Sequence, residues 1–348
     1  MPTPPSPSLP PPGPSALGSA PVLAQVVRSG VTESVHHGVL AVTAADGSVT
    51  SATGPVDAPV FPRSSNKPIQ ALAMLRHGLA LEGELLALAC ASHNGEAFHL
   101  EGTRRILASV GLDESALQNT PDLPIHEPTR IRWECAGTAP ASVAQNCSGK
   151  HAAMLATCVV NGWDTTGYRD PAHPLQQAIT ATLAELAGEP VAATGTDGCG
   201  APVMAVSTAG LARAFGRLAA APADSLEGRV AGAMRRHPDY VGGTGRDVTQ
   251  LMQSVPGLLA KDGAEAVYAV GLADGRGLAL KIADGSQRAR AVVTVAALER
   301  MGVRPADGSW HGLDVEPVLG HGEPVGSVVA VLPDAEAGPE HTDEAVTG

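Results

Sequence analysis

The order of strand-like and helix-like segments constrains the fold of this chain more than any other feature. Residues 38–54, GVLAVTAADGSVTSATG, form two β-rich runs around Asp46-Gly47, a dipeptide typical of a hairpin turn. Residues 266–286, AVYAVGLADGRGLALKIADGS, indicate a second hairpin around ADGRG. Helix-like runs lie between the two hairpins and after the second. This order predicts an α+β fold, in which an antiparallel sheet packs with a helical region.

The helix-like runs contain apolar residues that recur at helical spacing. Residues 150–163, KHAAMLATCVVNGW, are apolar enough for a buried helix. Residues 174–188, PLQQAITATLAELAG, are amphipathic and end at Gly188, a residue suited to a helix C-cap. Further helices are expected at residues 68–79, 85–93, 100–111 and 289–302. Only 3% of residues are aromatic, so the core has to consist mainly of Ala, Val and Leu.

The composition argues against several classes of partner. The formal net charge is −12, which disfavours nucleic acid and anionic membranes because both bind basic surfaces. No apolar run reaches membrane-spanning length, and the first residues lack the basic and apolar regions of a secretory signal. Five cysteines, an odd and sparse set, favour a reducing compartment. We therefore expect a soluble cytoplasmic protein that binds small solutes.

The two ends of the chain differ in composition from its body. Residues 1–21 are rich in Pro and Ser and are expected to form a disordered leader. Residues 334–348 are expected to form a flexible acidic tail. Between these ends there is no internal repeat and no obvious linker, so residues 22–333 are predicted to form a single α+β domain.

Lysine is scarce in this chain. The 23 Lys and Arg residues include only four lysines, at positions 67, 150, 261 and 281. A genome that favours arginine codons is the simple explanation. Each remaining lysine nevertheless marks a position where arginine would not serve, because lysine loses its proton when buried and arginine does not.

Ser64 and Lys67 lie three residues apart in FPRSSNKPIQALAML, residues 61–75. Pro68 is tolerated only near a helix start, so the helix should begin between Ser64 and Lys67, with both side chains on one face. A neutral lysine amine, favoured by burial and by a cation such as Arg63, would take the serine proton and make the serine a nucleophile. The alternative is a capping serine followed by a solvated lysine.

A second polar cluster ends an apolar run in LACASHNGE, residues 88–96. Ser92 is followed at once by His93, Asn94 and Glu96. Polar residues grouped at the end of a buried element often mark a functional site. The alternative is a helix that ends in an ordinary polar turn.

Two Gly-rich turns, NCSGKHAAML and TGTDGCGAPVM, each carry a cysteine next to an apolar segment. Cys147 and Cys199 could bind Zn²⁺ together with a nitrogen donor, which would be His151 or a neutral Lys150 amine. Buried inert cysteines, a Cys147–Cys199 disulfide and a cysteine nucleophile are alternatives, and the spacing does not choose among them. Asp197, beside Cys199, is a candidate to bind an ammonium group.

Together these motifs resemble the asparaginase II family, the rhizobial-type L-asparaginases. The resemblance covers residues 28–303 and rests on RSSNKPIQALAML, CASHNGE, NCSGKHAAMLA, DPAHPLQ, GTDGCGAP, HPDYVGGTGR and AEAVYAVG, in family order. It implies a fold similar to serine β-lactamases and glutaminases and suggests a homodimer. It also implies an amidohydrolase that converts L-asparagine to L-aspartate and ammonia.

Two Ser–Lys pairs of the family match this sequence, and the resemblance implies that both are catalytic: Ser64 with Lys67, and Ser92 with Lys261. One lysine would accept the proton of the attacking serine and return it to the leaving ammonia, after which water would release the acyl-enzyme. Ser64 is the chemically simpler nucleophile, whereas Ser92 would attack in its place or relay protons.

The metal site implied by the resemblance, which looks like zinc, consists of Cys147, Lys150 and Cys199. Zinc would order the site without being required for the nucleophilic step. The carboxylate of the substrate would bind Arg63 or Arg246 through a bidentate contact. A surface salt bridge is the alternative role for Arg246.

Two other functions are compatible with the sequence. A penicillin-recognising serine hydrolase shares the Ser-x-x-Lys motif, but this chain lacks a Lys-Thr-Gly element. A zinc-stabilised amino-acid sensor would bind the same ligand without hydrolysis, although it would not need the Ser–Lys pairs. Asparagine and glutamine differ by one methylene, worth only about 1–3 kcal/mol in a pocket, so the sequence separates them weakly.

Overall fold

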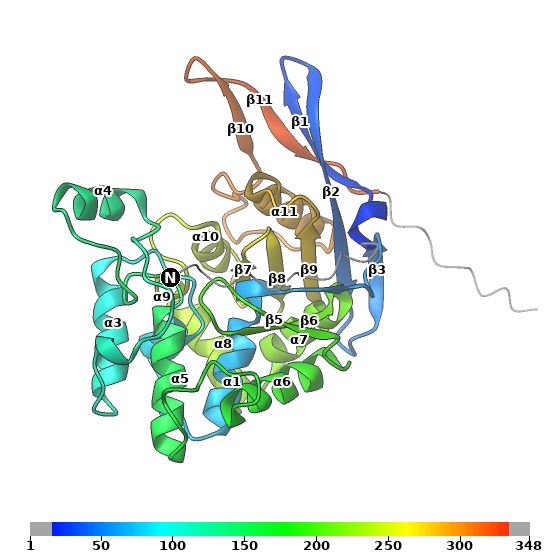
Figure 1. Ribbon diagram of the computed structural model, residues 1–348. Helices are drawn as coiled ribbons and strands as arrows, with labels where there is room; N and C mark the ends of the chain where they lie inside the picture. The colour runs from blue at the N-terminus through cyan, green and yellow to red at the C-terminus, as the bar shows by residue number, and fades with distance from the viewer. Residues whose placement is uncertain (1–15, 334–348) are drawn as a thin grey trace, which may run out of the picture.

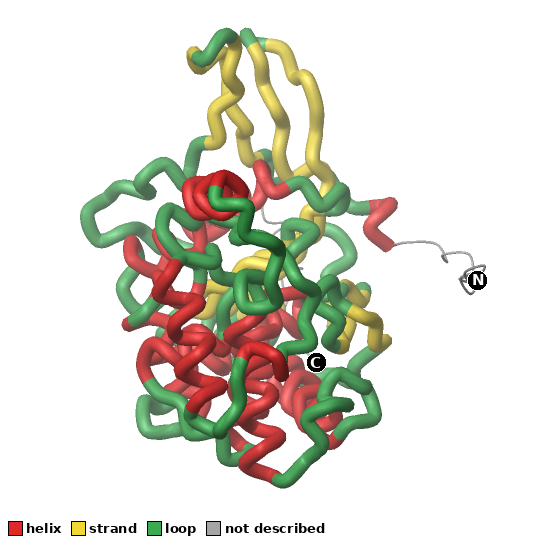
Figure 2. Tube along the Cα trace, turned by 60° about the vertical axis from the view of Figure 1, so that its left-hand side comes forward, coloured by secondary structure: helices red, strands yellow, loops and turns green. Residues whose placement is uncertain are grey.

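A computed structural model describes residues 16–333 as two antiparallel sheets beside a large helical region (Figure 1; Figure 2). The larger sheet has the strand order β10-β11-β1-β2-β9-β8-β7, with β3 paired to β2, and the smaller sheet has the order β4-β6-β5. The strands are β1 (Val22–Arg28), β2 (Val31–Thr43), β3 (Val49–Thr53), β4 (Pro59–Val60), β5 (Ala193–Thr196), β6 (Pro202–Ser207), β7 (Leu259–Gly263), β8 (Val267–Gly271), β9 (Gly277–Ile282), β10 (Glu316–Gly320) and β11 (Glu323–Ala330).

The helical region surrounds α1 and α5, which contact each other and most of the neighbouring helices. Its members are α1 (Lys67–Arg76), α2 (Gly83–Ala89), α3 (Ala97–Ala108), α4 (Glu127–Cys135), α5 (Ser148–Asn161), α6 (Pro174–Ala187), α8 (Leu226–Arg236), α9 (Pro238–Val241) and α10 (Asp247–Ser254). Within residues 16–333, every helix is too short or too polar to cross a membrane.

Helix α7 (Thr208–Ala220) lies directly on strands β8 and β9 of the larger sheet. Gly271 and Gly277 permit this close contact, because an added Cβ would overlap the carbonyl oxygens of Phe215 and Ala212. A second helix, α11 (Arg290–Arg300), contacts β8, β9 and β11. Small residues therefore bring helix and sheet together, which is how a core with few aromatic side chains reaches dense packing.

Strand β2 links the two parts of the larger sheet. Its residues 31–37 pair with β1, and its residues 38–43 pair with β9. At the crossover Gly38 leaves no room for a side chain, since an added Cβ would lie 2.6 Å from the carbonyl oxygen of Lys281. Beyond this point β1, β10, β11 and the start of β2 project from the body as an arm (Figure 1).

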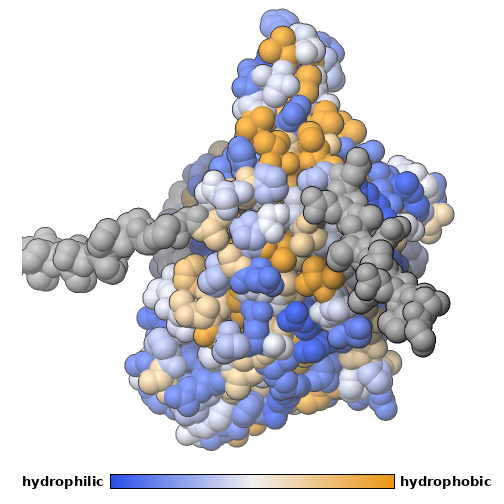
Figure 3. Space-filling model, turned by 90° about the vertical axis from the view of Figure 1, so that its right-hand side faces the viewer, coloured by the Kyte–Doolittle hydropathy of each residue, from blue (hydrophilic) through white to orange (hydrophobic). Residues whose placement is uncertain are grey.

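The arm carries exposed apolar side chains, and Figure 3 shows hydrophobic residues gathered on it. Val35 on β2 is 40% exposed and Val329 on β11 is 44% exposed. Both belong to the same cross-strand row, because Gln25 of β1 lies opposite each of them. An apolar patch on one sheet face is typical of a surface that another molecule covers.

The α+β fold predicted from the order of segments is confirmed. The two predicted hairpins are β2 with β3 and β8 with β9. Gly188 ends α6 with a φ of 69°, in the left-handed conformation expected of a C-cap. A 3₁₀ turn over Arg63–Asn66 precedes α1, which starts at Lys67 inside the predicted interval. The strands β10 and β11 were not expected from the sequence.

The folded chain begins earlier than the predicted leader boundary at residue 21. Ala16–Ser19 forms a 3₁₀ turn, and Ala20 is buried because it packs into the core. The boundary was therefore placed too late for residues 16–21. Residues 1–15 of the predicted leader and residues 334–348 of the predicted tail lie outside the described residues.

The end of β7 lies against the 3₁₀ turn that carries Ser64, and Gly263 permits this approach. An added Cβ at Gly263 would lie 2.6 Å from the carbonyl oxygen of Pro62 and 3.3 Å from the amide nitrogen of Ser65. We expect Gly263→Ala to lower the free energy of unfolding by about 1–3 kcal/mol through overpacking, as measured by urea denaturation. Gly18→Ala is the control, since an added Cβ there meets nothing within 4 Å. Equal stability of the two variants would contradict this prediction.

Candidate active site

A buried serine lies between two lysines where α1, the loop after α2, and β7 meet. The Oγ of Ser92 is 3.1 Å from the Nζ of Lys67 and 3.0 Å from the Nζ of Lys261. Each of these three residues is at most 3% exposed. A hydroxyl both accepts and donates a hydrogen bond, so Ser92 can connect the two amines.

Lys261 is held by the residue that follows it. Its Nζ donates to Oδ1 of Asp262 at 2.5 Å and to the Asp262 carbonyl oxygen at 2.8 Å. Burial lowers the pKa of the Lys261 ammonium to about 8, although the Asp262 carboxylate opposes the shift. Lys261 is therefore a buried amine that loses its proton close to neutral pH.

Asp262 stays ionised although it is buried. Burial favours its protonated form, but the cations of Lys261, Arg246 and Arg290 outweigh this effect and hold the pKa of Asp262 well below its usual range. Arg246 contributes through an ion pair of 2.7 Å between its Nη2 and Oδ2 of Asp262. Asp262 was not predicted from the sequence, in which its place next to Lys261 is the only signal.

Lys67 uses its three donors on acceptors from different parts of the chain. Besides Ser92, its Nζ donates to the carbonyl oxygen of Ala91 at 2.5 Å and to the Sγ of Cys147 at 3.0 Å. Lys67 can reach both because it starts α1, where its side chain points out of the helix end. This lysine therefore joins the serine to the cysteine-containing turn.

Ser64 lies one 3₁₀ turn before Lys67, and the backbone N–H of Lys67 donates to the Ser64 carbonyl oxygen. Side chains three residues apart eclipse each other in a 3₁₀ turn, so Ser64 and Lys67 share one face as predicted. Ser64 is partly exposed. Within residues 16–333 its hydroxyl makes no hydrogen bond, so the structure does not join Ser64 to Lys67 directly.

The cluster after Ser92 holds the serine loop in place. His93 is fully buried, and its Nε2 donates to the Oγ of Ser148 at 2.8 Å, since its Nδ1 accepts from the N–H of Gly95. The backbone N–H of His93 donates to the carbonyl oxygen of Asn146. Asn94 bonds Glu96, which also accepts from the backbone of residue 244. These contacts tie the Ser92 loop to the turn that contains Cys147.

Cys147, Lys150 and Cys199 meet in a second buried cluster. Cys147 is the N-cap residue of α5, Lys150 lies in the first turn of that helix, and Cys199 belongs to the turn between β5 and β6. The Nζ of Lys150 is 3.2 Å from the Sγ of Cys199. The three residues are between 2% and 4% exposed.

The pKa values of the two cysteine thiols in this cluster shift in opposite directions. A hydrogen bond from Cys199 holds the pKa of Cys147 well below its usual range against the cost of burial, and the Lys67 and Lys150 cations lower it further. The same hydrogen bond raises the pKa of Cys199. Burial disfavours the Lys150 ammonium, but the two sulfurs and Asp197 outweigh this and raise its pKa.

The donor set of this cluster fits zinc. Zn–S bonds of about 2.3 Å and Zn–N bonds of about 2.0 Å place a sulfur and a nitrogen ligand about 3.5 Å apart in a tetrahedral site. The contact of 3.2 Å between Lys150 and Cys199 is close to this value. Within the described part of the chain, no group of three or more His, Cys, Asp or Glu side chains could hold a metal ion. A zinc site at this cluster would therefore need Lys150 as a ligand.

His151, the other nitrogen donor considered for a metal, has a different partner. Its Nδ1 lies 2.7 Å from the hydroxyl of Tyr168. Its Nε2 is buried and has no hydrogen-bond partner among the described residues. Burial holds the pKa of His151 well below its usual range, with Lys150 and Lys67 adding to the shift. Between the two candidate donors, Lys150 is the one in contact with a cysteine sulfur.

Arg63 and Asp197, each predicted to bind substrate, bind each other. Their side chains form an ion pair of 2.8 Å. Burial favours protonation of Asp197, but the Lys150 and Arg63 cations outweigh it and lower the pKa of the carboxyl group. Arg63 adopts a φ of 52°, a left-handed conformation that few side chains adopt without support from their surroundings.

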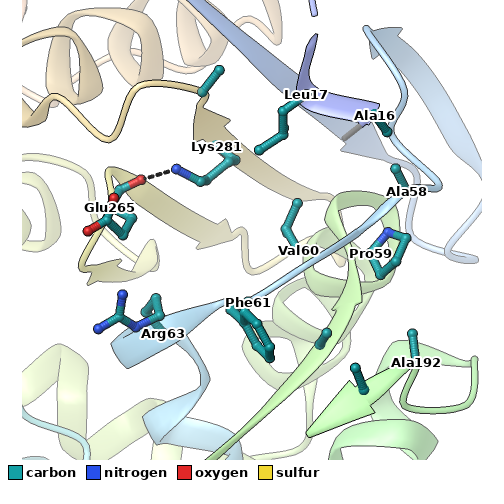
Figure 4. A pocket seen from close by; sticks show the side chains of 13 residues that line it. Ala16, Leu17, Ala58, Pro59, Val60, Phe61, Arg63, Ala192, Glu265 and Lys281 are labelled. Atoms are coloured by element: carbon teal, nitrogen blue, oxygen red, sulfur yellow. Dashed lines mark hydrogen bonds between the residues drawn. The ribbon is translucent and has the colours of Figure 1, made fainter. Parts of the chain in front are cut away.

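A cavity of about 430 Å³ extends from Arg63 over β4, β6 and β9 (Figure 4). Phe61, Val60 and small side chains form its apolar wall. Lys281 lines the same cavity and donates to the carbonyl oxygen of Glu265 at 2.5 Å. The fourth lysine therefore lies near Arg63 but outside the two lysine clusters described above.

Comparison with known proteins identifies the class of protein to which this fold and site belong. The family model of L-asparaginase II matches residues 24–330. The chain belongs to the L-asparaginase II family, which confirms the resemblance found in the motifs. A search of curated proteins finds no match.

A search of solved structures finds chains with a distant similarity to this one. Mglu in its tris and glutamate form shares 13% identity at a TM-score of 0.44, with 84% of this chain and 65% of that chain covered. This chain therefore spans less than two thirds of the length of that protein. A β-lactamase from Mycobacterium bovis shares 15% identity at a TM-score of 0.43, with 82% and 97% covered. A Bacillus glutaminase shares 14% identity at a TM-score of 0.38, with 76% and 91% covered.

Proposed function

We propose that this protein is an amidohydrolase that cleaves the side-chain amide of L-asparagine, giving L-aspartate and ammonia. The observation that carries the proposal is the group formed by Lys67, Ser92 and Lys261, which is buried beside the turn that bears Ser64. Two buried amines joined by a hydroxyl can store and return one proton, which amide hydrolysis requires. The membership of the chain in the L-asparaginase II family supports the choice of substrate.

We infer that Ser64 is the nucleophile and Ser92 the proton relay. A nucleophile has to approach the substrate carbon, and Ser64 is partly exposed whereas Ser92 is only 3% exposed. Ser92 already contacts both lysines, so its hydroxyl is occupied as a bridge. The missing contact between Ser64 and Lys67 is compatible with this role, because catalytic hydrogen bonds tighten when substrate binds.

In the first step the Oγ of Ser64 forms a bond to the amide carbon, and the serine proton passes to a neutral Lys67. The tetrahedral intermediate then breaks its C–N bond, and Lys67 returns the proton so that ammonia leaves. Water attacks the resulting ester and loses a proton to the same amine; the C–O bond to Ser64 then breaks, and Lys67 returns the proton to the Oγ of Ser64 as aspartate is released. Lys67 becomes neutral when a proton moves through Ser92 to a deprotonated Lys261.

The amino-acid part of the substrate has two charges, and the Arg63–Asp197 ion pair offers a partner for each. Asp197 would accept the ammonium group, and the Arg63 guanidinium would bind the carboxylate through two parallel hydrogen bonds. Arg246 is the alternative partner for the carboxylate, and Asp262 holds its guanidinium at 2.7 Å much as Asp197 holds that of Arg63.

We propose that Cys147, Lys150 and Cys199 hold a zinc ion. Zinc bound there would supply a fixed positive charge that orders the two cysteine-containing turns. The bond-making steps are carried out by residues of the chain and not by the metal. Lys67 contacts both Cys147 and Ser92, so a metal that fixes the position of Cys147 would also help to fix the position of Lys67.

The predicted homodimer and cytoplasmic location stay predictions, as does the absence of nucleic-acid and membrane partners. The apolar face of the arm, which includes Val35 and Val329, supports association of two copies. A monomeric mass in sedimentation equilibrium at working concentration would contradict the dimer.

Ammonia release by purified protein tests the function and the role of each serine. We expect release from L-asparagine in excess of that from L-glutamine. Ser64→Ala should remove activity and the acyl-enzyme seen by mass spectrometry, whereas Ser92→Ala should still acylate, at least about 100-fold more slowly, because the proton relay is broken. Ser65→Ala is the matched control, since its hydroxyl bonds only the Pro62 carbonyl oxygen.

Failure of wild-type protein to release ammonia from either amide, with asparagine still bound, would favour the amino-acid sensor. Reaction with a fluorescent penicillin would favour the penicillin-recognising hydrolase. Acylation of Ser64→Ala at the wild-type rate would transfer the nucleophilic role to Ser92.

The pH dependence of kcat/KM should report the buried amines. The pKa of Lys261 is lowered to about 8, so the group becomes neutral, and able to accept a proton, as the pH rises through that value. We expect kcat/KM for L-asparagine to rise between about pH 6 and 9 and then level off, as Lys261 loses its proton. Lys261→Arg should abolish this rise, because arginine keeps its proton. A flat or falling wild-type profile would contradict the proposed relay.

Metal content tests the zinc proposal separately from activity. Elemental analysis should find about one zinc per chain in wild-type protein and almost none in Lys150→Arg, because guanidinium keeps its positive charge but cannot coordinate a metal. Lys281→Arg is the matched control, since this buried lysine contacts only backbone carbonyls. Equal zinc in all three proteins would refute the site, and chelation that leaves KM and kcat unchanged would refute its ordering role.

A further inference from the structure

A second cavity, of about 420 Å³, lies between the start of α2, helix α8 and the segment that joins α7 to α8. Its lining is rich in charged and small residues: Glu82, Gly83, Leu86, Ala221, Ala223, Gly228, Arg229, Gly232, Arg235 and Arg236. Three arginines therefore face a single carboxylate. This is unusual in a chain with 35 acidic and 23 basic residues, where a surface cluster of arginines is expected to attract acidic neighbours.

The arginines of this cavity are largely without carboxylate partners. Arg229 approaches Glu82 at 3.5 Å, but the side chain of Glu82 is 84% exposed, so the pair is weak. Arg235 donates from Nη2 to the carbonyl oxygen of Ala219, at the end of α7. The side chain of Arg236 makes no hydrogen bond or ion pair with any residue of the described range 16–333. At least two guanidinium groups thus have free donors at the cavity.

Arg235 also has a donor that the protein leaves unpaired. Its Nε is buried and has no hydrogen-bond partner among the described residues. Burial lowers the pKa of this guanidinium, and no carboxylate offsets the shift. An unpaired buried donor on a charged group is costly, because the group has lost water without gaining an acceptor. A bound anion would supply that acceptor.

Glycines on α8 keep the cavity open beside the arginines. Nη1 of Arg236 lies 3.0 Å from the position of an added Cβ at Gly232, so the guanidinium folds back over the glycine. Gly228, one turn earlier, also lines the cavity. A larger side chain at Gly232 would occupy space next to the Arg236 guanidinium, whereas an added Cβ at Gly228 would overlap the carbonyl oxygen of Pro222.

We propose that this cavity binds a small phosphate-bearing anion. Arginine presents a planar fork of N–H donors that matches phosphate oxygens, and several forks around one cavity favour an anion with more than one charge. The chemistry is shared by free phosphate and by a phosphate ester, and the cavity volume leaves room for an organic group. A carboxylate offers fewer oxygens and less charge to the same three arginines.

The anion cavity is separate from the candidate active site. It is lined by Gly83 and Leu86 from the first part of α2, whereas Ser92 follows the other end of that helix. A helix of this length spans roughly 10 Å. Binding at the cavity can therefore be measured without reference to amide hydrolysis.

The proposal is tested by isothermal titration calorimetry of the intact protein with inorganic phosphate and with glycerol 3-phosphate, at constant ionic strength set by sodium chloride. We expect one saturable site and a rise in Tm with either probe. Arg235→Gln and Arg236→Gln should each weaken binding by about tenfold or more, since each removes a charge-assisted contact. Arg304→Gln is the matched control: it removes one positive charge from an exposed arginine that pairs with Glu299 elsewhere.

Tighter binding of glycerol 3-phosphate than of phosphate would identify an ester as the natural class of ligand, and the reverse would identify the free anion. Absence of binding by both probes would overturn the proposal, as would binding that survives in Arg236→Gln. Arg236→Gln is the decisive variant. The wild-type Arg236 side chain makes no hydrogen bond in the described structure, and its replacement leaves the hydrogen bond from Arg235 to the carbonyl oxygen of Ala219 intact. Arg236→Lys should retain part of the affinity if charge contributes as well as geometry.

Discussion

The structure depends on the burial of two lysine side chains around one serine. Removal of an ammonium group from water costs several kcal/mol even after the protein relaxes, unless charge and hydrogen bonds replace the water. Asp262 provides the charge for Lys261, and the sulfur of Cys147 and a backbone carbonyl provide acceptors for Lys67. The start of α1, the end of α2 and strand β7 must keep their relative positions, because displacement of any one leaves a buried charge without its partner.

This constraint links the candidate catalytic and metal clusters into one network. Ion pairs and hydrogen bonds run without interruption from Arg246 through Asp262, Lys261, Ser92, Lys67 and Cys147. The hydrogen bond between the two cysteines continues the network to Lys150, and Asp197 adds its charge to that lysine and pairs with Arg63. Positive and negative groups alternate along parts of this path, whereas Lys67 and Lys261 lie on either side of the neutral Ser92 hydroxyl and repel each other. A change in one cluster therefore alters the electrostatics of the other.

Much of the local structure was predictable because its signals are local. The dipeptide Asp46-Gly47 indicates a hairpin, Gly188 indicates a helix end, and Pro68 places the start of α1. The motif residues Ser64, Lys67 and Lys150 were identified by spacing and by resemblance. Strands β10 and β11 were missed, because short runs with Gly and Pro resemble turns until a partner strand such as β1 pairs with them.

The sequence by itself determined the two hairpins, several of the helices and the residue types available to the site, because helical spacing, turn chemistry and scarce lysines act over a few residues. Only the tertiary structure decided that Ser92 contacts both lysines, since 169 residues separate it from Lys261. The same holds for the pairing of Arg63 with Asp197 and for the partners of Asp262. Such contacts depend on how α1, α2 and β7 pack, and packing is set by the whole core rather than by any short segment.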